Sequence, residues 1–272
     1  MPTSMFRSLH MRSGSGLFKV LRRALELVLV PVFLLACADQ TATTHNTVRV
    51  AVASNFSATL HDLKPVFESE TGYSLSISTG SSGKLYAQIA QAAPFDVFLS
   101  ADDVLPTRLV NNGLAAESTQ FTYAYGQLVL WSAKPDTDLM ERISAPGLRR
   151  LAIANPSLAP YGRAAMEYLT DAGFHETVSD KLVYGENVGQ TFAFVETRNA
   201  ELGFVAYSQI LSRPKRKRGV YVLIDAASHA PIRQDGIILN TAADAPRARA
   251  FMSFLQSERA IDIIEAAGYR RP

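Results

Sequence analysis

Residues 48–56 read VRVAVASNF, and residues 73–85 read YSLSISTGSSGKL. In both stretches larger apolar residues alternate with small or polar ones, which predicts a half-buried strand, and each alternation ends in a run of serine, asparagine or glycine. After the first run, apolar residues recur three and four positions apart, as on one face of a helix, at Phe56, Leu60, Leu63 and Phe67. A helical spacing also follows the second run. The two stretches therefore predict two successive units of strand, loop and helix.

Two loops that can donate hydrogen bonds follow these strands. If the strands are parallel neighbours in one sheet, residues 53–56 and 80–83 lie side by side at its carboxyl edge, where ligands bind in such sheets. Hydroxyl groups, amide groups and the free N–H groups of a helix N-terminus all donate to an anion. Neither loop contains the Asp or Glu that hydrogen phosphate would need as an acceptor. The loops therefore predict an oxyanion site without a charged ligand, although Ser54, Asn55 and Ser82 could serve only as helix caps.

The first 38 residues have the layout of a secretory signal peptide. Five basic residues precede a ten-residue apolar run at 27–36, which is too short to cross a bilayer. Ala36, Cys37 and Ala38 fit cleavage by the ordinary signal peptidase, which would release a periplasmic protein beginning near Asp39. Leu34 to Cys37 resembles a lipobox, which would leave the protein lipid-anchored through Cys37. We expect release into the periplasm, with the anchor as the alternative.

The charge balance changes when this leader is removed. The whole chain has 27 basic and 25 acidic residues, and loss of the five basic residues and one acidic residue of the leader leaves 22 and 24. A net charge near −2 gives no reason to expect nucleic acid as a partner. The basic run at 213–218 has no interleaved aromatic residues and reads as a solvated loop. Cys37 is the only cysteine, so the mature chain has neither a disulfide nor a thiolate metal site.

Strand and helix patterns continue to alternate beyond residue 95, which favours an α/β fold with mostly parallel sheets. The expected strands are 97–100, 128–131, 151–154, 182–184, 202–206, 220–224 and 236–239. The expected helices are 103–112, 162–172, 189–197 and 245–267.

Six blocks of this chain together resemble one protein family. They are ASNF at 53–56, GSSGKL at 80–85, PFDVFLSAD at 94–102, NPSLAPYGRAA at 155–165, GENVGQTFAFV at 185–195 and ELGFVAYSQ at 201–209. Their order and spacing, over residues 47–269, resemble those of the periplasmic molybdate-binding proteins of ABC importers. The resemblance implies the two-lobed periplasmic binding protein fold, with mostly parallel sheets flanked by helices and the ligand in the interlobe cleft. The implied first lobe is 47–123 plus 232–272, and the second is 124–231.

The same resemblance implies the ligand, the partners and the contacts. The chain would capture molybdate, and tungstate as well, without a cofactor, and would act as a monomer that delivers the anion to an ABC permease and its ATPase subunit at the inner membrane. The oxyanion would be hydrogen-bonded, with no direct coordination of the metal. Another oxyanion such as sulfate is the alternative ligand. The implied contacts are Ser54, Asn55, Ser82, Tyr161 and the backbone amides of Val188 and Ala101.

Two positions depart from the better-known pattern of the family. Asn55 stands where a serine is usual, and Ala206 stands where a tyrosine ligand is usual. The chain therefore resembles the subgroup that supplies its phenol from Tyr161, with Tyr207 as the substitute if Tyr161 does not serve.

Enzyme functions fit the sequence poorly. Gly80 to Lys84 lacks the glycine spacing of a phosphate-binding P-loop, and Leu85 stands where that motif needs Ser or Thr. The Gly-x-Ser-x-Gly motif of a serine hydrolase does not occur. No histidine of the mature chain pairs with a carboxylate at a catalytic spacing. We therefore expect a binding protein and not an enzyme, with an exported hydrolase as the remote alternative.

Overall fold

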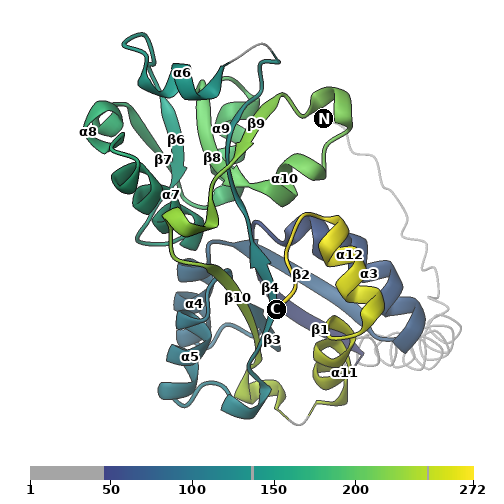
Figure 1. Cartoon of the computed structure of the whole chain (residues 1–272). Coiled ribbons are helices and arrows are strands. Elements are labelled where there is room, and N and C mark those ends of the chain that lie inside the picture. Colours follow the sequence, from purple (N-terminus) through teal and green to yellow (C-terminus); the bar gives the residue numbers. More distant parts are fainter. Residues whose placement is uncertain (1–45, 136–137, 244) are drawn as a thin grey trace, which may run out of the picture. The chain divides into compact units, whose positions relative to one another are not determined.

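Two five-stranded sheets organise residues 46–135, 138–243 and 245–272, which are the parts of the chain that this computed structural model describes (Figure 1). The predicted signal peptide at 1–38 and Cys37 lie outside these ranges. Within them, no helix has both the length and the apolar content that crossing a membrane requires.

The first sheet carries the two serine-rich loops. Its strand order is β2 (Ser74–Gly80), β1 (Thr47–Ala53), β3 (Val97–Leu99), β10 (Ile232–Ile238) and β4 (Phe121–Gly126). β1 is parallel to β2 and β3, whereas β10 is antiparallel to β3 and β4. In the register of β1 and β2, Ala53 lies opposite Gly80, so the loops that follow begin at the same level of the sheet.

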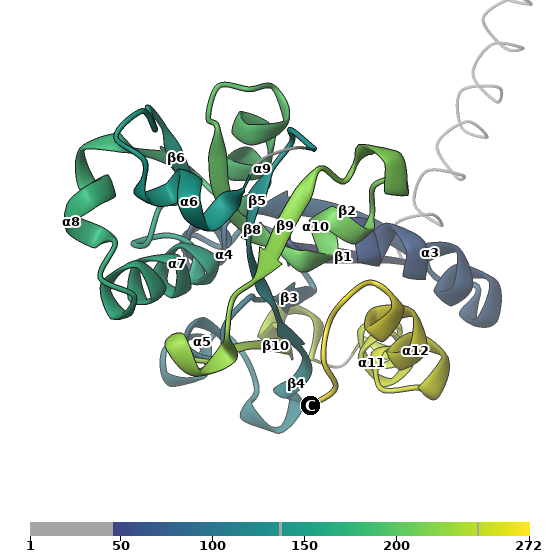
Figure 2. The same ribbon diagram turned by 45° about the horizontal axis from the view of Figure 1, so that its top comes forward.

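The second sheet has the strand order β7 (Leu182–Gly185), β6 (Leu151–Ala154), β8 (Leu202–Ala206), β5 (Leu128–Ser132) and β9 (Val220–Leu223). β6 is parallel to β7 and β8, and β5 is antiparallel to β8 and β9. The chain passes between the sheets twice, from β4 to β5 through Gln127 and from β9 to β10 (Figure 2). We call each sheet with its helices a lobe. The predicted lobe boundaries at 123 and 231 stay predictions.

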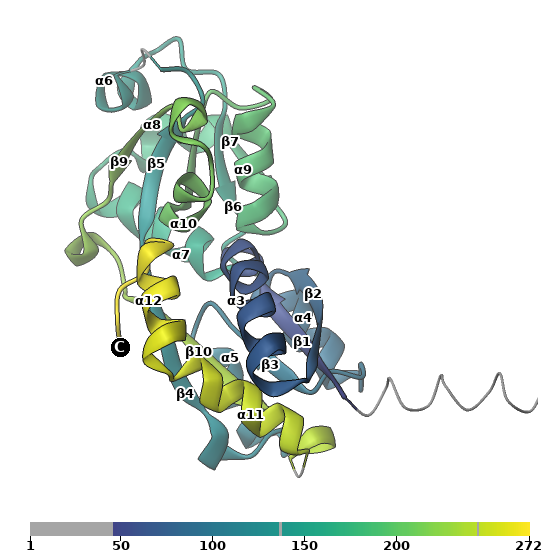
Figure 3. The ribbon, with the colours of Figure 1, turned by 90° about the vertical axis from the view of Figure 1, so that its right-hand side faces the viewer.

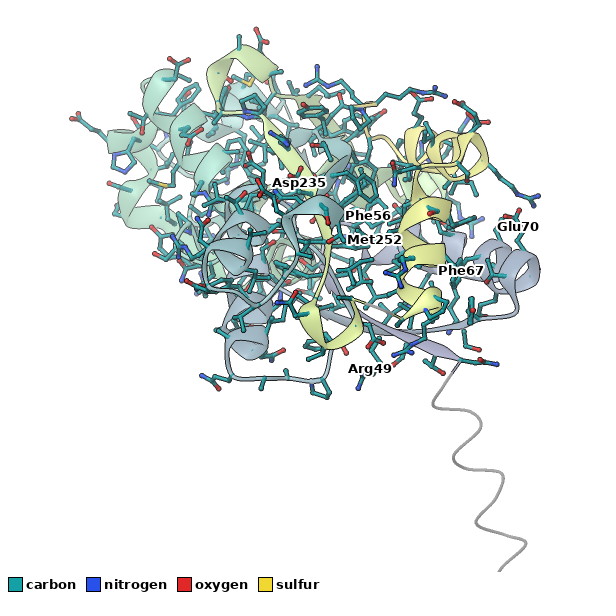
Figure 4. The ribbon with its side chains drawn as sticks, turned by 90° about the horizontal axis from the view of Figure 1, so that it is seen from below. Arg49, Phe56, Phe67, Glu70, Asp235 and Met252 are labelled. Atoms are coloured by element: carbon teal, nitrogen blue, oxygen red, sulfur yellow. The ribbon has the colours of Figure 1, made fainter. Side chains whose placement is uncertain are left out.

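Helices cover both faces of each sheet. α3 (Ser57–Thr71), α11 (Pro246–Leu255) and α12 (Glu258–Ala266) contact one another on one face of the first sheet (Figure 3). Phe56, Phe67 and Met252 belong to the apolar core beneath them (Figure 4). α4 (Ser82–Ala90) and α5 (Val104–Asn111) contribute Leu85 and Leu109 to the core of the opposite face. The second lobe contains α6 (Leu139–Ser144), α7 (Pro160–Asp171), α8 (His175–Val178), α9 (Val188–Glu196) and α10 (Tyr207–Leu211).

Short 3-10 turns complete the described chain at η1 (Glu117–Thr119), η2 (Ser179–Lys181), η3 (Lys215–Lys217), η4 (Ala226–Ser228) and η5 (Asn240–Ala242). The expected α/β alternation is present, but both sheets are mixed and not mostly parallel, because β10 and β5 run antiparallel to their neighbours. The sequence pattern predicts none of β4, α6, α8 and α10. The single helix expected at 245–267 is two helices, because Ser257 ends the first run and caps α12 by accepting a hydrogen bond from the Ala260 amide at 3.2 Å.

A buried carboxylate ties three elements of the first lobe together. Asp96, directly before β3, is fully buried and accepts hydrogen bonds from the backbone N–H and the guanidinium of Arg49 at 2.8 and 2.7 Å. Arg247 of α11 donates to the same carboxylate at 3.2 Å. Burial alone would raise the pKa of Asp96, but the hydrogen bonds from Arg49 and the nearby charge of Arg247 outweigh it, so the pKa lies below its usual value.

The variant Asp96→Asn should lower the free energy of unfolding by about 2–4 kcal/mol, because two arginines lose their buried partner. Urea titration followed by circular dichroism measures this loss. The matched control is Asp262→Asn, whose carboxylate is exposed and pairs with Arg271 at 3.3 Å. This control should change stability by no more than about 0.5 kcal/mol.

The contribution of Asp96 to the free energy of unfolding should fall in acid. A carboxyl group with a lowered pKa in the folded state stabilises the fold above its unfolded pKa of about 4, and that stabilisation is lost as the pH falls through the folded pKa. The stability difference between the wild type and Asp96→Asn should therefore be constant near neutrality and shrink below about pH 4. A difference that grows in acid would contradict the assignment.

Candidate functional site

The loops after β1 and β2 meet the N-termini of α7 and α9 around one small pocket. The pocket is lined by Ala53, Ser54, Asn55, Gly80, Ser81, Ser82, Ala101, Ala159, Pro160, Tyr161, Asn187 and Val188. All six predicted contact residues are in this set, which comes from both lobes. The free space is about 10 Å³ for the centre of a water-sized sphere. Two larger hollows, of about 730 and 690 Å³, contain none of the predicted residues.

Other residues than the predicted ones cap the helices at this pocket. Ser81 caps α4 by accepting a hydrogen bond from the Lys84 amide at 3.3 Å, which leaves Ser82 in the first turn. Asn187 caps α9 by accepting from the Gln190 amide at 3.0 Å. α3 has no side-chain cap. Ser54, Asn55 and Ser82 therefore do not serve as caps here.

Besides the cap Ser81, three hydroxyl groups of the pocket already act as acceptors. Ser54 Oγ accepts from the Gly189 amide at 3.2 Å, and Ser82 Oγ accepts from the Ala101 amide at 3.0 Å. The Tyr161 hydroxyl accepts from Gln234 Nε2 at 3.3 Å. A hydroxyl carries one proton, and among the described residues none accepts the proton of these three groups. Each is therefore left to donate to a ligand.

Backbone amides add further donors. Ser82 and Val188 are the first residues of α4 and α9, where the helix offers their N–H groups no acceptor. The backbone N–H of Asn55 likewise donates to no other described residue. None of the residues that line the pocket is Asp or Glu. The pocket is thus rich in donors and has no carboxylate.

Two predicted contacts are arranged differently from the expectation. The Ala101 amide donates to Ser82 Oγ, so in this structure it supports a pocket hydroxyl. The side-chain amide of Asn55 donates to Gln234 Oε1 at 2.9 Å and to the Tyr269 hydroxyl at 3.2 Å, which uses both of its protons. Asn55 Oδ1 is buried without a partner. The donor that Asn55 offers is therefore its backbone N–H.

The phenol at the pocket belongs to Tyr161. This residue is the second of α7, after Pro160, and its side chain is fully buried. Tyr207 packs on Tyr221, with ring centroids 5.5 Å apart, and does not line the pocket. The geometry therefore favours Tyr161 over Tyr207 as the ligand phenol.

Comparisons with known proteins agree with this architecture. Residues 48–270 match the family described as bacterial extracellular solute-binding protein. The chain is 43% identical to a molybdate-binding protein of Azotobacter vinelandii, over 87% of this chain and 93% of that one. It is 40% identical to one of Rhodobacter capsulatus, over 80% and 86%.

This chain belongs to the bacterial extracellular solute-binding proteins. The solved structure of the A. vinelandii periplasmic molybdate-binding protein superposes with a TM-score of 0.78 at 39% identity, over 83% of this chain and 99% of that one. The expected two-lobed α/β fold and the family resemblance are both confirmed. A sulfate-binding protein of Mycobacterium tuberculosis, at 13% identity and a TM-score of 0.71, shows the shared fold alone.

Contacts between the lobes surround the pocket of this solute-binding protein. The Gly83 amide donates to the Leu158 carbonyl at 2.9 Å, and a Cβ at position 83 would lie 3.0 Å from that oxygen, so glycine permits the close approach. Arg163 of α7 pairs with Asp102 at 2.6 Å. Lys84 of α4 pairs with Glu186 at 2.6 Å, with both side chains about half exposed. The structure is therefore that of closed lobes.

Sequence reasoning missed three residues that support the site. Gln234, Tyr123 and Tyr269 are buried behind the pocket. Gln234 and Tyr269 hydrogen-bond to pocket residues, and Tyr123 hydrogen-bonds to Gln234. Gln234 stands between Arg233 and Asp235 in β10, so its local sequence gives no signal that it is a core residue. Its partners lie 73 to 179 residues away, so only the fold identifies them.

Tyr161 should stay protonated in mildly alkaline solution. Burial, and next the neighbouring Tyr269, raise the pKa of Tyr161 well above its usual value of about 10. The stabilisation from the neutral phenol is complete below the unfolded pKa and is lost only as the pH rises through the folded pKa. Ultraviolet titration of the wild type and Tyr161→Phe should therefore give the same ionisation amplitude up to about pH 10. A smaller amplitude for the variant in that range would contradict the burial argument.

Proposed function

We propose that this solute-binding protein captures molybdate, and also tungstate, in the cleft between its lobes and delivers it to an ABC importer. The observation that carries the proposal is the set of three pocket hydroxyls, on Ser54, Ser82 and Tyr161, each of which accepts one hydrogen bond within the protein and keeps its proton for a ligand. Molybdate is a fully deprotonated dianion near neutral pH, so it needs donors only. The names of the relatives at 40–43% identity support the same ligand.

The proposed contacts are Ser54, Ser82, Tyr161 and the amides of Asn55 and Val188, with Ala101 acting through Ser82. The first turns of α4 and α9 add the positive ends of two helix dipoles. The oxyanion is hydrogen-bonded, and its metal is not coordinated by the protein. In the described residues, no group of three or more His, Cys, Asp or Glu side chains could hold a metal ion.

Ligand binding proceeds by closure of the lobes. The pocket of this closed structure has room for about one water molecule, so the lobes must separate to admit a tetrahedral anion and close less tightly around it than here. Contacts from both lobes then stabilise the closed form, because the open form cannot make them together. The two crossings between the sheets are the places where a hinge can bend.

Sulfate is the alternative ligand, because it is also a dianion without a proton. It is smaller than molybdate and would leave part of a molybdate-sized shell of donors at longer distances. The sulfate-binding protein shares only 13% identity with this chain, whereas the molybdate-binding relatives share 40% and more. Molybdate is therefore the favoured ligand.

The partners follow from this role. The protein acts in the periplasm as a monomer that is exported by the signal peptide at 1–38, and it docks on a permease whose ATPase subunit drives import. Release near Asp39 is proposed over a lipid anchor on Cys37. The protein is a binding protein and does not act as an enzyme. Residues 47–123 plus 232–272 and residues 124–231 are the proposed lobes.

Isothermal titration of the mature chain with molybdate, tungstate, sulfate and phosphate tests the proposed function. Molybdate and tungstate should bind in the submicromolar range, whereas phosphate should not bind, because no carboxylate in the pocket can accept its proton. Tight binding of sulfate or phosphate with no response to molybdate would overturn the proposal.

Removal of single donors should weaken molybdate binding. Ser82→Ala and Tyr161→Phe should each cost about 1.5–3 kcal/mol, or roughly ten- to hundred-fold in affinity, because each removes one hydrogen bond to a charged group. Tyr207→Phe is the matched control, since Tyr207 lies outside the pocket, and it should bind like the wild type. Unchanged affinity in both pocket variants would show that the anion binds elsewhere.

A further inference from the structure

We propose that Gln234, which does not line the pocket, is a positioning residue that directs the hydroxyl proton of Tyr161 into it and thereby restricts the site to anions that only accept hydrogen bonds. The inference rests on the proposed function, because the proton matters only if an oxyanion binds there. It follows from the directions of a chain of buried hydrogen bonds behind the pocket.

The chain of hydrogen bonds begins at a group that can only accept. The backbone carbonyl of Asn55 receives the Tyr269 hydroxyl at 2.8 Å and the Ser208 hydroxyl at 3.1 Å. Since the single proton of Tyr269 is used on that side, its oxygen presents a lone pair to Asn55 Nδ2 at 3.2 Å. The side-chain amide of Asn55 is therefore held with its NH₂ group inward.

The orientation of the Asn55 side-chain amide fixes that of Gln234. The second N–H of Asn55 Nδ2 donates to Gln234 Oε1 at 2.9 Å, and this contact fixes the orientation of Gln234. The Tyr123 hydroxyl lies 3.0 Å from the same oxygen and 2.9 Å from the Ser100 carbonyl, so its single proton is shared between the two acceptors. With its oxygen facing Asn55, Gln234 turns Nε2 toward the Tyr161 hydroxyl at 3.3 Å. An NH₂ group can only donate, so the Tyr161 oxygen must accept and its proton must point elsewhere.

Two further features fit this role. Gln234 is fully buried in β10, so its side-chain amide is shielded from bulk solvent. A Cβ at Gly126, the last residue of β4, would collide with the Tyr161 hydroxyl and would lie 2.6 Å from Gln234 Nε2. Glycine at this position makes room for the contact between the phenol and the amide.

This arrangement leaves one polar atom of Asn55 without a hydrogen bond. Its Oδ1 is buried without a partner, which is rare in folded proteins. Rotation of the Asn55 amide by half a turn would place its oxygen against Gln234 Oε1 and would oblige Gln234 to rotate as well. Gln234 would then present an oxygen to Tyr161, and the phenol would donate to Gln234 and be lost to the ligand. The orientation of Gln234 thus decides the direction of the Tyr161 proton.

A double-mutant cycle tests whether Gln234 acts through Tyr161. Molybdate affinity is measured by isothermal titration for the wild type, Gln234→Met, Tyr161→Phe and the double variant, after thermal melts have shown that each is folded. Gln234→Met should bind about five- to tenfold more weakly, because the phenol loses its fixed direction. The double variant should match Tyr161→Phe within about twofold. Additive losses would mean that Gln234 has only a structural role, and no loss in Gln234→Met would also overturn the inference.

A second variant tests the direction of the Tyr161 hydroxyl proton. Gln234→Glu places an acceptor against Tyr161 when it is ionised, so molybdate binding should fall more than about a hundredfold at pH 8 and recover in part at pH 6 as the introduced carboxyl takes up a proton. The exposed Gln256→Glu controls for the added charge and should bind like the wild type at both values. Equal affinities of the wild type and Gln234→Glu at pH 8 would overturn this inference and leave the proposed function standing. No binding of molybdate by the wild type would overturn the proposed function with it.

Discussion

Each hydroxyl oxygen at the pocket of this protein is already occupied as an acceptor, and the rest of the site depends on that constraint. Ser54 receives the Gly189 amide, Ser82 receives the Ala101 amide, and Tyr161 receives Gln234. A hydroxyl group can accept or donate in any direction that its rotation permits, so its chemistry is ambiguous until one partner is fixed. The backbone and the buried amides remove that ambiguity, and they leave the protons of Ser54, Ser82 and Tyr161 for a ligand.

The fold supplies the geometry for this arrangement. The register of β1 with β2 places Ala53 opposite Gly80, and the two serine-rich loops therefore begin side by side. The second lobe brings α7 and α9 against them, and the Gly189 amide reaches Ser54 across the cleft. Two of the three hydroxyls are thus oriented by a residue of the other lobe, Ser54 by Gly189 and Tyr161 by Gln234, which couples the donor set to closure.

Local pattern was enough to predict part of the site from the sequence. Alternation and helical spacing predicted β1, β2 and the loops with Ser54 and Ser82, because these signals lie within about 35 consecutive residues. Tyr161 and Val188 came from the family resemblance, since nothing in their local pattern relates them to the first lobe. Tyr161 lines the pocket as that resemblance implied.

The remainder required three-dimensional structure. Asn55 bonds to Gln234 and Tyr269, which are 179 and 214 residues away, so the direction of its amide could not be read from its neighbours in sequence. The role of Ala101 changed for the same reason, because its amide meets Ser82 from the loop after β3, 19 residues away. Residue types indicated donors, but only the packing showed which protons are free.

A high-resolution structure of the mature chain with bound molybdate tests the central claim most directly. The account predicts the anion between the lobes, with Ser82 Oγ, the Tyr161 hydroxyl and the Val188 amide each about 2.7–3.2 Å from its oxygens and no carboxylate in contact. Molybdate bound outside this cleft, or against an Asp or Glu side chain, would contradict it.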